Sequence, residues 1–336
     1  MSDDRVLVTG AAGFIGGHLV AHLRRMGIQV AATDIQPQGD FQRDIPWHHC
    51  DLLDAAATKA LLLEVRPTCV LHLAARTDLN ETNTIAGYAA NIDGVDNLLD
   101  GIRAAGTVRR LICTSSQLVC YVGYEPTNDQ DYRPTTLYGE SKVLTEKKCR
   151  TADGAGASWC LVRPTTVWGP RMNPHYLRFF SMIRDGKYVH VGRGPTRKSY
   201  SYVGNIVQQY VALMNAPADR VHRRMFYLAD YTPIAIEGWA EAFRSALGAP
   251  RIRAIPTWVA KAVARGGDLL NSLGYSSFPF NSFRLRNVLT PYRADTAPIA
   301  AVCETLPYSM EDGVAKTADW LREVWADEAA KSGQHN

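Results

Sequence analysis

Over its first two thirds, the chain alternates short, uniformly apolar runs with longer stretches in which apolar residues recur every three or four positions. The short runs predict buried strands, and the longer stretches predict amphipathic helices. Strands are expected at 5–9, 28–33, 68–73, 109–114 and 158–163, and helices at 14–26, 55–65, a stretch ending near 105, and 137–150. This alternation predicts an α/β fold in which helices cover both faces of a parallel sheet.

The pattern changes after about residue 170, because Gly, Pro and Tyr become frequent between Gly169 and Tyr202. Later apolar periodicity predicts helices near 176–185, 205–215, 234–247, 257–270 and 310–329. We therefore expect residues 1–170 to form a doubly wound parallel sheet, to which some later segments return. Residues 171–330 are expected to form a smaller, mostly helical substrate-binding lobe, and residues 331–336 a loose tail.

Composition narrows the class of protein. The chain has 336 residues, of which 46% are hydrophobic, a share that is ordinary for a soluble globular protein. Its net charge of +4 is too small to favour binding to nucleic acid. Its seven cysteines contain no CxxC pair, so we expect a reducing compartment and no metal site. No apolar stretch is long enough to span a bilayer, and the first strand begins too early for a signal peptide. These features favour a cytoplasmic protein without a membrane partner.

The segment Thr9–Gly16 (TGAAGFIG), between the first expected strand and helix, has the spacing of a dinucleotide-binding loop. Gly10 permits a tight turn, Gly13 lets the backbone approach a pyrophosphate, and Gly16 allows the helix to pack closely on the strand. The helix that opens at Phe14 and Ile15 offers free N–H groups and a positive dipole end to the phosphates.

Two aspartates favour particular cofactor contacts. Asp34 ends the second expected strand, where a carboxylate accepts hydrogen bonds from a ribose 2′-hydroxyl and repels a 2′-phosphate. No arginine follows it directly, so the sequence favours NAD over NADP. Asp51, which precedes Leu52, is placed either to reach the adenine amine or to cap the next helix.

Tyr138 and Lys142 are four residues apart on an expected helix, so they lie on one face of it. A tyrosine has a pKa of about 10, and a neighbouring ammonium lowers this pKa by favouring the phenolate. The pair can therefore act as acid and base on a hydroxyl or carbonyl beside a nicotinamide. Ser115 and Ser116 follow the strand at 109–114, where hydroxyls line the ligand crevice of such sheets or simply cap the strand end.

In these segments and their order, the chain resembles the extended short-chain dehydrogenases/reductases, in the nucleotide-sugar epimerase/dehydratase branch that includes UDP-galactose 4-epimerases. The matching pieces are TGAAGFIG (9–16), Asp34, CDL (50–52), HLAA (72–75), Asn91, TSS (114–116), YGESK (138–142) and RPTTVWGP (163–170). The resemblance implies a Rossmann-type sheet, a permanently held NAD, and a homodimer formed through the helices near 91–105 and 137–150.

The resemblance also implies roles for individual residues. Catalysis is expected from Tyr138, Lys142 and Ser116. Cofactor contacts are expected at Gly10, Gly13, Phe14, Ile15, Gly16, Asp34, Asp51, Leu52, Leu73, Ala74, Ala75, Asn91, Tyr138, Lys142 and Pro164. Substrate contacts are expected at Thr77, Ser116, Gln117, Thr166, Arg197, Lys198 and Arg284.

The resemblance distinguishes Ser116 from Ser115 and favours one subclass. In the family, the catalytic hydroxyl lies three residues before the hydrophobic position that Val119 occupies here, which selects Ser116. Sugar 4,6-dehydratases carry acids at the next two positions, and reductase-epimerases carry a cysteine at the second, whereas this chain has Gln117 and Leu118. An epimerase is therefore favoured, most simply at C4 of a UDP- or GDP-linked sugar.

The expected substrate lobe departs from the family pattern. Thr166 stands where relatives often carry an asparagine, and Lys198 stands where they carry an arginine for the substrate diphosphate. Arg193, Arg197 and Lys198 either clamp a diphosphate or form a solvated basic loop. Arg284 or Arg286 is a candidate for the late arginine that completes the family's site.

Other functions stay open. The stretch YSYVGNIV (200–207) resembles that of hydroxysteroid dehydrogenase-like reductases, which implies an NAD-dependent dehydrogenase of a non-nucleotide alcohol that releases NADH. A nucleotide-sugar dehydratase is a further alternative. A non-catalytic NAD-sensing protein is disfavoured by the complete set of Tyr138, Lys142 and Ser116.

Overall fold

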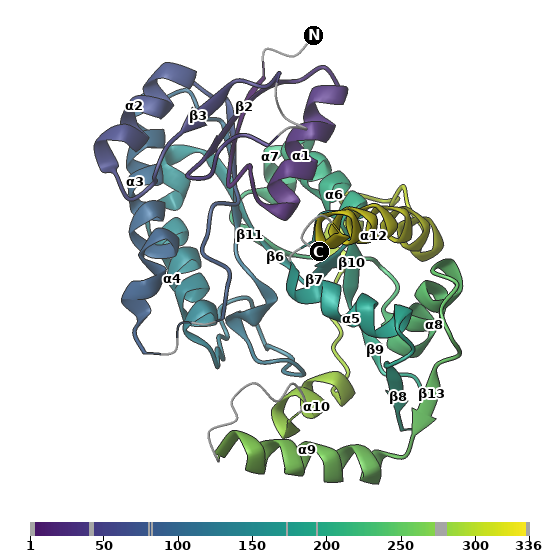
Figure 1. Cartoon of the computed structure of the whole chain (residues 1–336). Coiled ribbons are helices and arrows are strands. Elements are labelled where there is room, and N and C mark those ends of the chain that lie inside the picture. The colour runs from purple at the N-terminus through teal and green to yellow at the C-terminus, as the bar shows by residue number, and fades with distance from the viewer. Residues whose placement is uncertain are drawn as a thin grey trace. The chain divides into compact units, whose positions relative to one another are not determined.

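The computed structural model of the chain describes residues 4–39, 44–79, 81, 83–172, 174–192, 194–272 and 281–333. The chain divides into two compact units, each assembled from separate segments (Figure 1). The first unit comprises Met1–Val167, Ser201–Tyr231 and Ala294–Pro307, and the second comprises Trp168–Tyr200, Thr232–Arg293 and Tyr308–Asn336.

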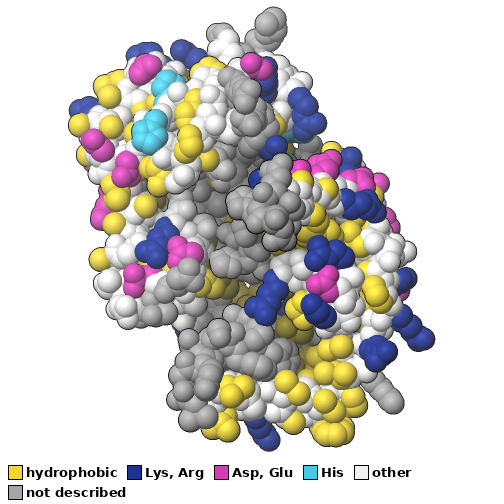
Figure 2. Space-filling model, viewed as in Figure 1, with side chains coloured by type: hydrophobic (Ala, Val, Ile, Leu, Met, Phe, Trp, Pro, Cys, Tyr) yellow, Lys and Arg dark blue, Asp and Glu magenta, His cyan; other side chains and the backbone are white. Residues whose placement is uncertain are grey.

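Basic and acidic side chains are interspersed on the face shown in Figure 2. Among the described helices, none combines the length and the apolar character that crossing a bilayer requires.

The first unit is built on a seven-stranded sheet in the order β11–β6–β5–β4–β1–β2–β3, and all neighbouring strands are parallel. Its strands are β1 (Arg5–Thr9), β2 (Gln29–Asp34), β3 (Trp47–His49), β4 (Cys69–His72), β5 (Arg110–Thr114), β6 (Ser158–Pro164) and β11 (Arg224–Leu228). The helices are α1 (Phe14–Arg25), α2 (Ala55–Val65), α3 (Ala89–Ala105), α4 (Leu137–Thr151), α6 (Val203–Asn215), α7 (Ala218–Val221) and α11 (Ala297–Ala300), with short 3-10 turns η2 (Ile85–Tyr88), η3 (Gln117–Val119) and η4 (Asp153–Gly156).

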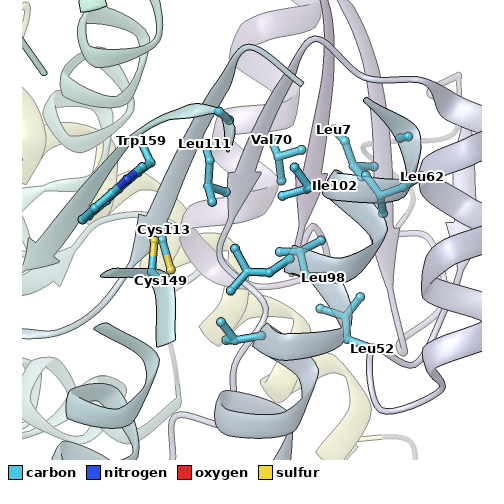
Figure 3. Close-up of a cluster of buried hydrophobic side chains, with 14 of the residues drawn as sticks. Leu7, Leu52, Leu62, Val70, Leu98, Ile102, Leu111, Cys113, Cys149 and Trp159 are labelled. Carbon is cyan, nitrogen blue, oxygen red and sulfur yellow. The ribbon is translucent and has the colours of Figure 1, made fainter. Parts of the chain in front are cut away.

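Helices cover both faces of this sheet. On one face, Leu7 and Val70 of the strands pack against Leu62, Leu98 and Ile102 of α2 and α3 (Figure 3). Because side chains alternate along a strand, the neighbours of Leu7 in β1 point to the opposite face, where α1 and α6 pack together (Figure 1). The expected Rossmann-type doubly wound sheet is thus confirmed.

The second unit is mostly helical. It contains α5 (Pro174–Arg184), α8 (Ile236–Ala246), α9 (Thr257–Ser272), α10 (Ser282–Leu289) and α12 (Met310–Gly333), with the short pairs β8 (Val189–Val191) with β13 (Arg253–Ile255) and β9 (Arg197–Lys198) with β12 (Ile234–Ala235). Its core is aromatic: Trp239 of α8 stacks on Phe179 of α5 at 5.1 Å and meets Trp168 edge-on at 5.4 Å between ring centroids. The strands β7 (Thr166–Trp168) and β10 (Tyr200–Tyr202) pair with each other. Each contains a sequence position at which the chain leaves one unit and enters the other.

Some elements differ from the sequence-based expectation. The expected helix at 234–247 begins as β12 and becomes α8 only at Ile236. β11 was not expected, yet it pairs with β6 as the outer strand of the sheet. α12 continues to Gly333, three residues into the segment expected to be a loose tail.

Candidate active site

The glycine loop after β1 requires glycine at two positions for steric reasons. Gly10 has a φ of +70°, and a Cβ there would lie 2.6 Å from the backbone nitrogen of Ala74. A Cβ on Gly16 would lie 2.1 Å from the carbonyl oxygen of Gly10. Only glycine allows the loop to lie this close to the end of β4 and to the first turn of α1.

The start of α1 is open to an anion. Gly13 is its N-cap residue, in an extended conformation, and provides no side chain to occupy the N–H groups of the first turn, which begins with Phe14 and Ile15. These groups and the positive end of the helix dipole suit the phosphates of a dinucleotide. The glycine cradle and the uncapped helix start therefore fit the expected cofactor.

Asp34 holds the glycine loop in place. Its Oδ2 accepts a hydrogen bond from the backbone nitrogen of Ala12 at 2.9 Å, and its Oδ1 accepts one from that of Gln36 at 2.9 Å. Each carboxylate oxygen has a second lone pair, so these bonds leave acceptor capacity for a ribose hydroxyl. Its position at the end of β2 is the one that the predicted NAD contact requires.

Asp51 does not cap α2. It is exposed, and its Oδ1 accepts from the backbone nitrogen of its near neighbour Leu53 at 2.9 Å. Asp54 caps α2 instead, accepting from Ala57 at 2.9 Å. The helix-cap alternative for Asp51 is therefore wrong, and its adenine contact stays a prediction. The cofactor contact expected of the buried Leu52 stays a prediction too.

The segment after β4 is held by a hydroxyl that the sequence analysis did not single out. The Thr9 hydroxyl accepts hydrogen bonds from the backbone nitrogens of Leu73 and Ala74, both at 3.2 Å, and lies 2.8 Å from Nδ1 of His72. Burial, followed by the charge of Lys142, lowers the pKa of His72 to about 3, so its ring is neutral. The Thr9 hydroxyl and Nδ1 of the neutral ring share a hydrogen bond. Leu73, Ala74 and the following Ala75 are thereby fixed beside the glycine loop.

Asn91 acts on the same segment from α3. Its Oδ1 accepts from the backbone nitrogen of Arg76 at 2.8 Å, and its Nδ2 donates to the Arg76 carbonyl and to Ser141 Oγ, both at 2.9 Å. Ser141 Oγ donates in turn to the carbonyl of Tyr138 at 2.7 Å. The fully buried amide of Asn91 thus joins the loop after β4 to the first turn of α4.

Tyr138 lies in the first turn of α4, which Thr136 caps by accepting from the backbone nitrogen of Gly139 at 3.0 Å. A Cβ on Gly139 would lie 2.2 Å from the carbonyl oxygen of Leu118, so this glycine lets η3 rest directly on the helix. Ser116 is the N-cap residue of η3 and accepts from the backbone nitrogen of Leu118 at 3.1 Å. The structure therefore brings the segments of Ser116 and Tyr138 together.

Lys142 follows Tyr138 by one helical turn and is buried. Its Nζ donates to the carbonyl of Thr114 at 2.9 Å, at the end of β5 and next to the two candidate serines. Burial lowers the pKa of Lys142 to about 8. The amine is therefore still mostly charged at neutral pH and titrates close to it.

Ser115 is committed to a buried ion pair. Its hydroxyl donates to Glu146 Oε1 at 2.6 Å, and the same carboxylate accepts from Arg163 Nε at 2.7 Å and from the Tyr132 hydroxyl at 2.9 Å. Burial opposes the charge of Arg163, but the hydrogen bond and charge of Glu146 outweigh it and hold the pKa of Arg163 above its usual value. This arrangement leaves Ser116 as the serine available to a ligand, although its catalytic role stays a prediction.

The remaining candidates of the first unit lie at the ends of strands or after them. Nε2 of Gln117 donates to Thr166 Oγ1 at 3.4 Å, so these two predicted substrate contacts lie together. Pro164 ends β6 opposite Leu228 of β11. Thr77 is exposed on the segment after β4.

The basic candidates belong to the second unit. Lys198 is buried, donates to the carbonyl of Asn287 in α10, and has its pKa lowered to about 8 by burial. It is therefore not a solvated side chain, whereas Arg197 is exposed and donates to the carbonyl of Pro233 at 3.4 Å. Arg284 lies on α10, but its side chain and the whole of Arg193 fall outside the described part of the chain.

Comparison with known proteins gives matches of three kinds. Residues 6–229 match the model of the NAD dependent epimerase/dehydratase family. A 3 beta-hydroxysteroid dehydrogenase/Delta 5-->4-isomerase of Mycobacterium tuberculosis is 28% identical over 263 residues, which cover 73% of this chain and 70% of the relative. An N-acetyl-alpha-D-glucosaminyl-diphospho-ditrans,octacis-undecaprenol 4-epimerase of Escherichia coli O157:H7 is 30% identical over 210 residues, which cover 61% and 62%. UDP-glucose 4-epimerase of Thermotoga maritima, solved with UDP-glucose, shares the fold with a TM-score of 0.74 at 22% identity, over 96% of this chain and 99% of that one.

Proposed function

Because the chain belongs to the NAD-dependent epimerase/dehydratase family, we propose that it is a nucleotide-sugar epimerase that acts most simply at C4 of the sugar. One observation carries the proposal: Tyr138 and Lys142 share a face of α4 beside the Ser116 segment, and Gln117 and Leu118 stand where a dehydratase needs acids. A site with one proton-transfer group and no second acid can move a proton without expelling water.

Bound NAD supplies a reversible acceptor for one hydride. With the cofactor in place, Tyr138 would accept the proton of the sugar hydroxyl at the reacting carbon and would return it to the same oxygen. Lys142 favours the phenolate form of Tyr138 through its positive charge. Ser116 donates its hydroxyl hydrogen to the reacting oxygen, while the oxygen of its hydroxyl holds the backbone nitrogen of Leu118.

The sugar is oriented by Gln117 and Thr166. Gln117 Oε1 is buried, and no hydrogen-bond donor within the described residues reaches it. A buried acceptor without a donor is costly, so a sugar hydroxyl that donates to it contributes to binding. Nε2 of the same amide already donates to Thr166, which fixes the direction in which Oε1 points.

The diphosphate of a UDP- or GDP-linked sugar is held by Arg197, Lys198 and Arg284. Lys198 is a partly desolvated cation directly against α10, the helix that carries Arg284. Cations of this kind suit a phosphate oxygen because little solvation is lost when it binds. By their names, the E. coli relative acts on a diphospho-linked sugar and the Thermotoga protein was solved with UDP-glucose.

The test is a panel of UDP- and GDP-linked sugars incubated with the purified protein and read by mass spectrometry and NMR. An isomer of equal mass, formed without net NADH, supports the epimerase. A product lighter by one water contradicts it in favour of a dehydratase.

The second candidate is an NAD-dependent dehydrogenase of a non-nucleotide alcohol. The mycobacterial relative, a hydroxysteroid dehydrogenase by name, favours it. In that case an alcohol substrate yields NADH in stoichiometric amount, and no nucleoside diphosphate binds. Measuring NADH absorbance with each substrate class separates the two functions.

We further propose that the protein is a cytoplasmic homodimer. Its seven cysteines are free and buried, a state that a reducing compartment preserves. α3 and α4 pack side by side and are the pair through which the family resemblance implies dimer formation. Light scattering on the purified protein tests the dimer, and a mass of one chain contradicts it.

A further inference from the structure

Helix α9, in the second unit, buries small apolar side chains and exposes large ones, which is the reverse of the usual arrangement in a surface helix. The small residues Ala260 and Ala264 are fully buried and pack against Leu285 of α10. The large residues face solvent: Trp258 is 73% exposed and Leu269 is 61% exposed. Tryptophan and leucine are normally the residues that a helix buries, so this outer face needs an explanation.

The exposed apolar residues form one continuous face. At 100° per residue, Trp258, Leu269, Ala262, Leu270 and Val263 fall in that order within an arc of about 140°. Figure 2 shows hydrophobic side chains gathered over the region of α9. We call this set the α9 outer face.

Cations border the α9 outer face along one edge. Lys261 and Arg265 are exposed and lie within about 60° of Trp258 around the helix. Arg253, on the strand β13 that leads into the helix, and Arg251, two residues before it, are exposed as well. The one acid of the helix, Asp268, is hydrogen-bonded to the backbone nitrogen of Ser282 at 3.1 Å.

We propose that the α9 outer face docks on the surface of an anionic phospholipid bilayer. An apolar arc with cations at its edge lies flat in the interface, with the apolar side chains among the acyl chains and the cations at the headgroups. Tryptophan prefers this depth because its ring is apolar and its N–H stays near water. Docking of this kind needs no spanning helix, in keeping with what the described helices show.

The charge pattern favours a bilayer over a second copy of the chain. An antiparallel two-fold contact through this face would bring the cation edges of two copies together, where Lys261 and Arg265 repel their equivalents, and a parallel one would set those cations against an edge without acids. An anionic lipid surface satisfies the apolar arc and the cations at the same time. The sequence-based expectation of no membrane partner rests on the lack of a stretch long enough to span a bilayer, a criterion that does not apply to a helix lying on the surface.

The experiment is co-sedimentation of the full-length protein with vesicles of phosphatidylcholine alone and of phosphatidylcholine mixed with phosphatidylglycerol. We expect the protein to sediment with the mixed vesicles, less with the neutral ones, and less at high salt. Trp258→Ser and Leu269→Ser should each weaken partitioning about tenfold, and Lys261→Ser or Arg265→Ser about fivefold. The fluorescence of Trp258, obtained as the difference between wild type and Trp258→Ser, should shift to the blue on the mixed vesicles.

Leu63→Ser is the matched control, because Leu63 is a 44% exposed leucine on α2 in the other unit. It should leave partitioning unchanged, and all these variants should melt as the wild type does, since the side chains are exposed. No sedimentation with the mixed vesicles overturns the proposal. So does a loss in Trp258→Ser no larger than that in Leu63→Ser, or light scattering that shows a dimer which Trp258→Ser dissociates.

Discussion

Tyr138 is surrounded by residues that each have a defined task. Lys142 lies one turn further along α4 and donates to the carbonyl of Thr114, while Leu118 of η3, the turn that Ser116 caps, lies against Gly139 of the same helix. Ser115, its neighbour in sequence, is bound to Glu146 and therefore faces a different partner. At this scale the proposed chemistry depends on one phenol, one ammonium and one hydroxyl.

Replacing Tyr138 by phenylalanine removes only the proton-transfer group. We expect Tyr138→Phe to lower epimerase turnover by about 10²–10⁴-fold, the usual contribution of a positioned acid–base group. NAD binding should persist, because the ring is kept. Tyr308→Phe, in the second unit, is the control and should keep full activity. A Tyr138→Phe protein with undiminished turnover would falsify the assigned role.

The pKa of Lys142 predicts a dependence on pH. Burial lowers that pKa from 10.5 to about 8, so the ammonium loses its proton as the pH rises through 8. Activity should therefore fall above about pH 8, and Lys142→Arg should move this descending limb to higher pH if the variant remains active.

In the unfolded chain Lys142 keeps its proton up to the ordinary pKa of 10.5. Between pH 8 and 10.5 the unfolded state therefore binds more protons than the folded state, so this group makes the free energy of unfolding rise with pH. A pH–rate profile and denaturant melts across the range measure the two effects.

Two helices, α3 and α4, are tied to the sheet by buried polar side chains, through the segments that follow β4 and β5 and through β6. Asn91 of α3 joins the loop after β4 to Ser141 of α4, and Glu146 of α4 joins Ser115 to Arg163 of β6. These contacts orient the first turn of α4, which carries Tyr138, against the end of β5. The site is therefore positioned by whole elements and not by a flexible loop.

The ion pair between Glu146 and Arg163 is almost completely buried, with side-chain exposures of 0% and 1%. Glu146→Gln leaves the guanidinium of Arg163 without its counter-charge, and breaking a buried pair costs about 3–5 kcal/mol. We expect the free energy of unfolding to fall by this order in denaturant melts. Glu140→Gln, an exposed change on the same helix, should have almost no effect. Equal losses in the two variants would contradict the structural role of the pair.

Two glycines in helices should respond in opposite ways to the same substitution. A Cβ on Gly139 meets the Leu118 carbonyl at 2.2 Å, whereas a Cβ on Gly238 of α8 has Ala235 at 4.0 Å as its nearest neighbour. Gly139→Ala should push η3 away from α4 and lower both stability and turnover. Gly238→Ala should stabilise the protein by about 0.5–1 kcal/mol, because alanine is the better helix former. Thermal melting and turnover assays distinguish these outcomes.

Local features of the chain could be predicted from sequence because short-range physics controls them. The glycine loop, the helices at 14–26, 55–65 and 137–150, and the strands up to 163 follow from apolar periodicity and turn residues, and the structure places each within a few residues. β11 was missed because its run of five residues lies in the part of the chain where apolar periodicity predicts helices, and only its tertiary pairing with β6, as Phe226 with Val162, identifies it as a strand. The partners of Asn91 and the burial of Lys198 are likewise set by tertiary contacts that no sequence pattern encodes.

At the scale of the whole molecule, binding of the cofactor should increase the free energy of unfolding of the protein. The glycine cradle, the start of α1 and Asp34 exist together only in the folded first unit. A ligand that binds only the folded protein stabilises it, by about 2.7 kcal/mol at one hundred times its dissociation constant.

NAD should therefore raise the melting temperature of the protein, and NADP should raise it much less, because Asp34 repels a 2′-phosphate. Thermal shift assays with each nucleotide measure the difference. In Gly10→Ala the NAD shift should disappear, since the added Cβ collides with the Ala74 backbone. A larger shift with NADP than with NAD would contradict the assignment of Asp34.

All seven cysteines are buried thiols, and they are distributed over β4, β5, β6, α4 and the segments around them. A sulfhydryl reagent reaches such a group only when the surrounding structure opens. Cys113 and Cys149 lie side by side in the main core, whereas Cys303 belongs to a late segment that returns to the same unit (Figure 3). The rate at which a reagent modifies each thiol therefore reports how often the structure around that thiol opens. Seven such rates would compare local opening across the strands and segments of the first unit.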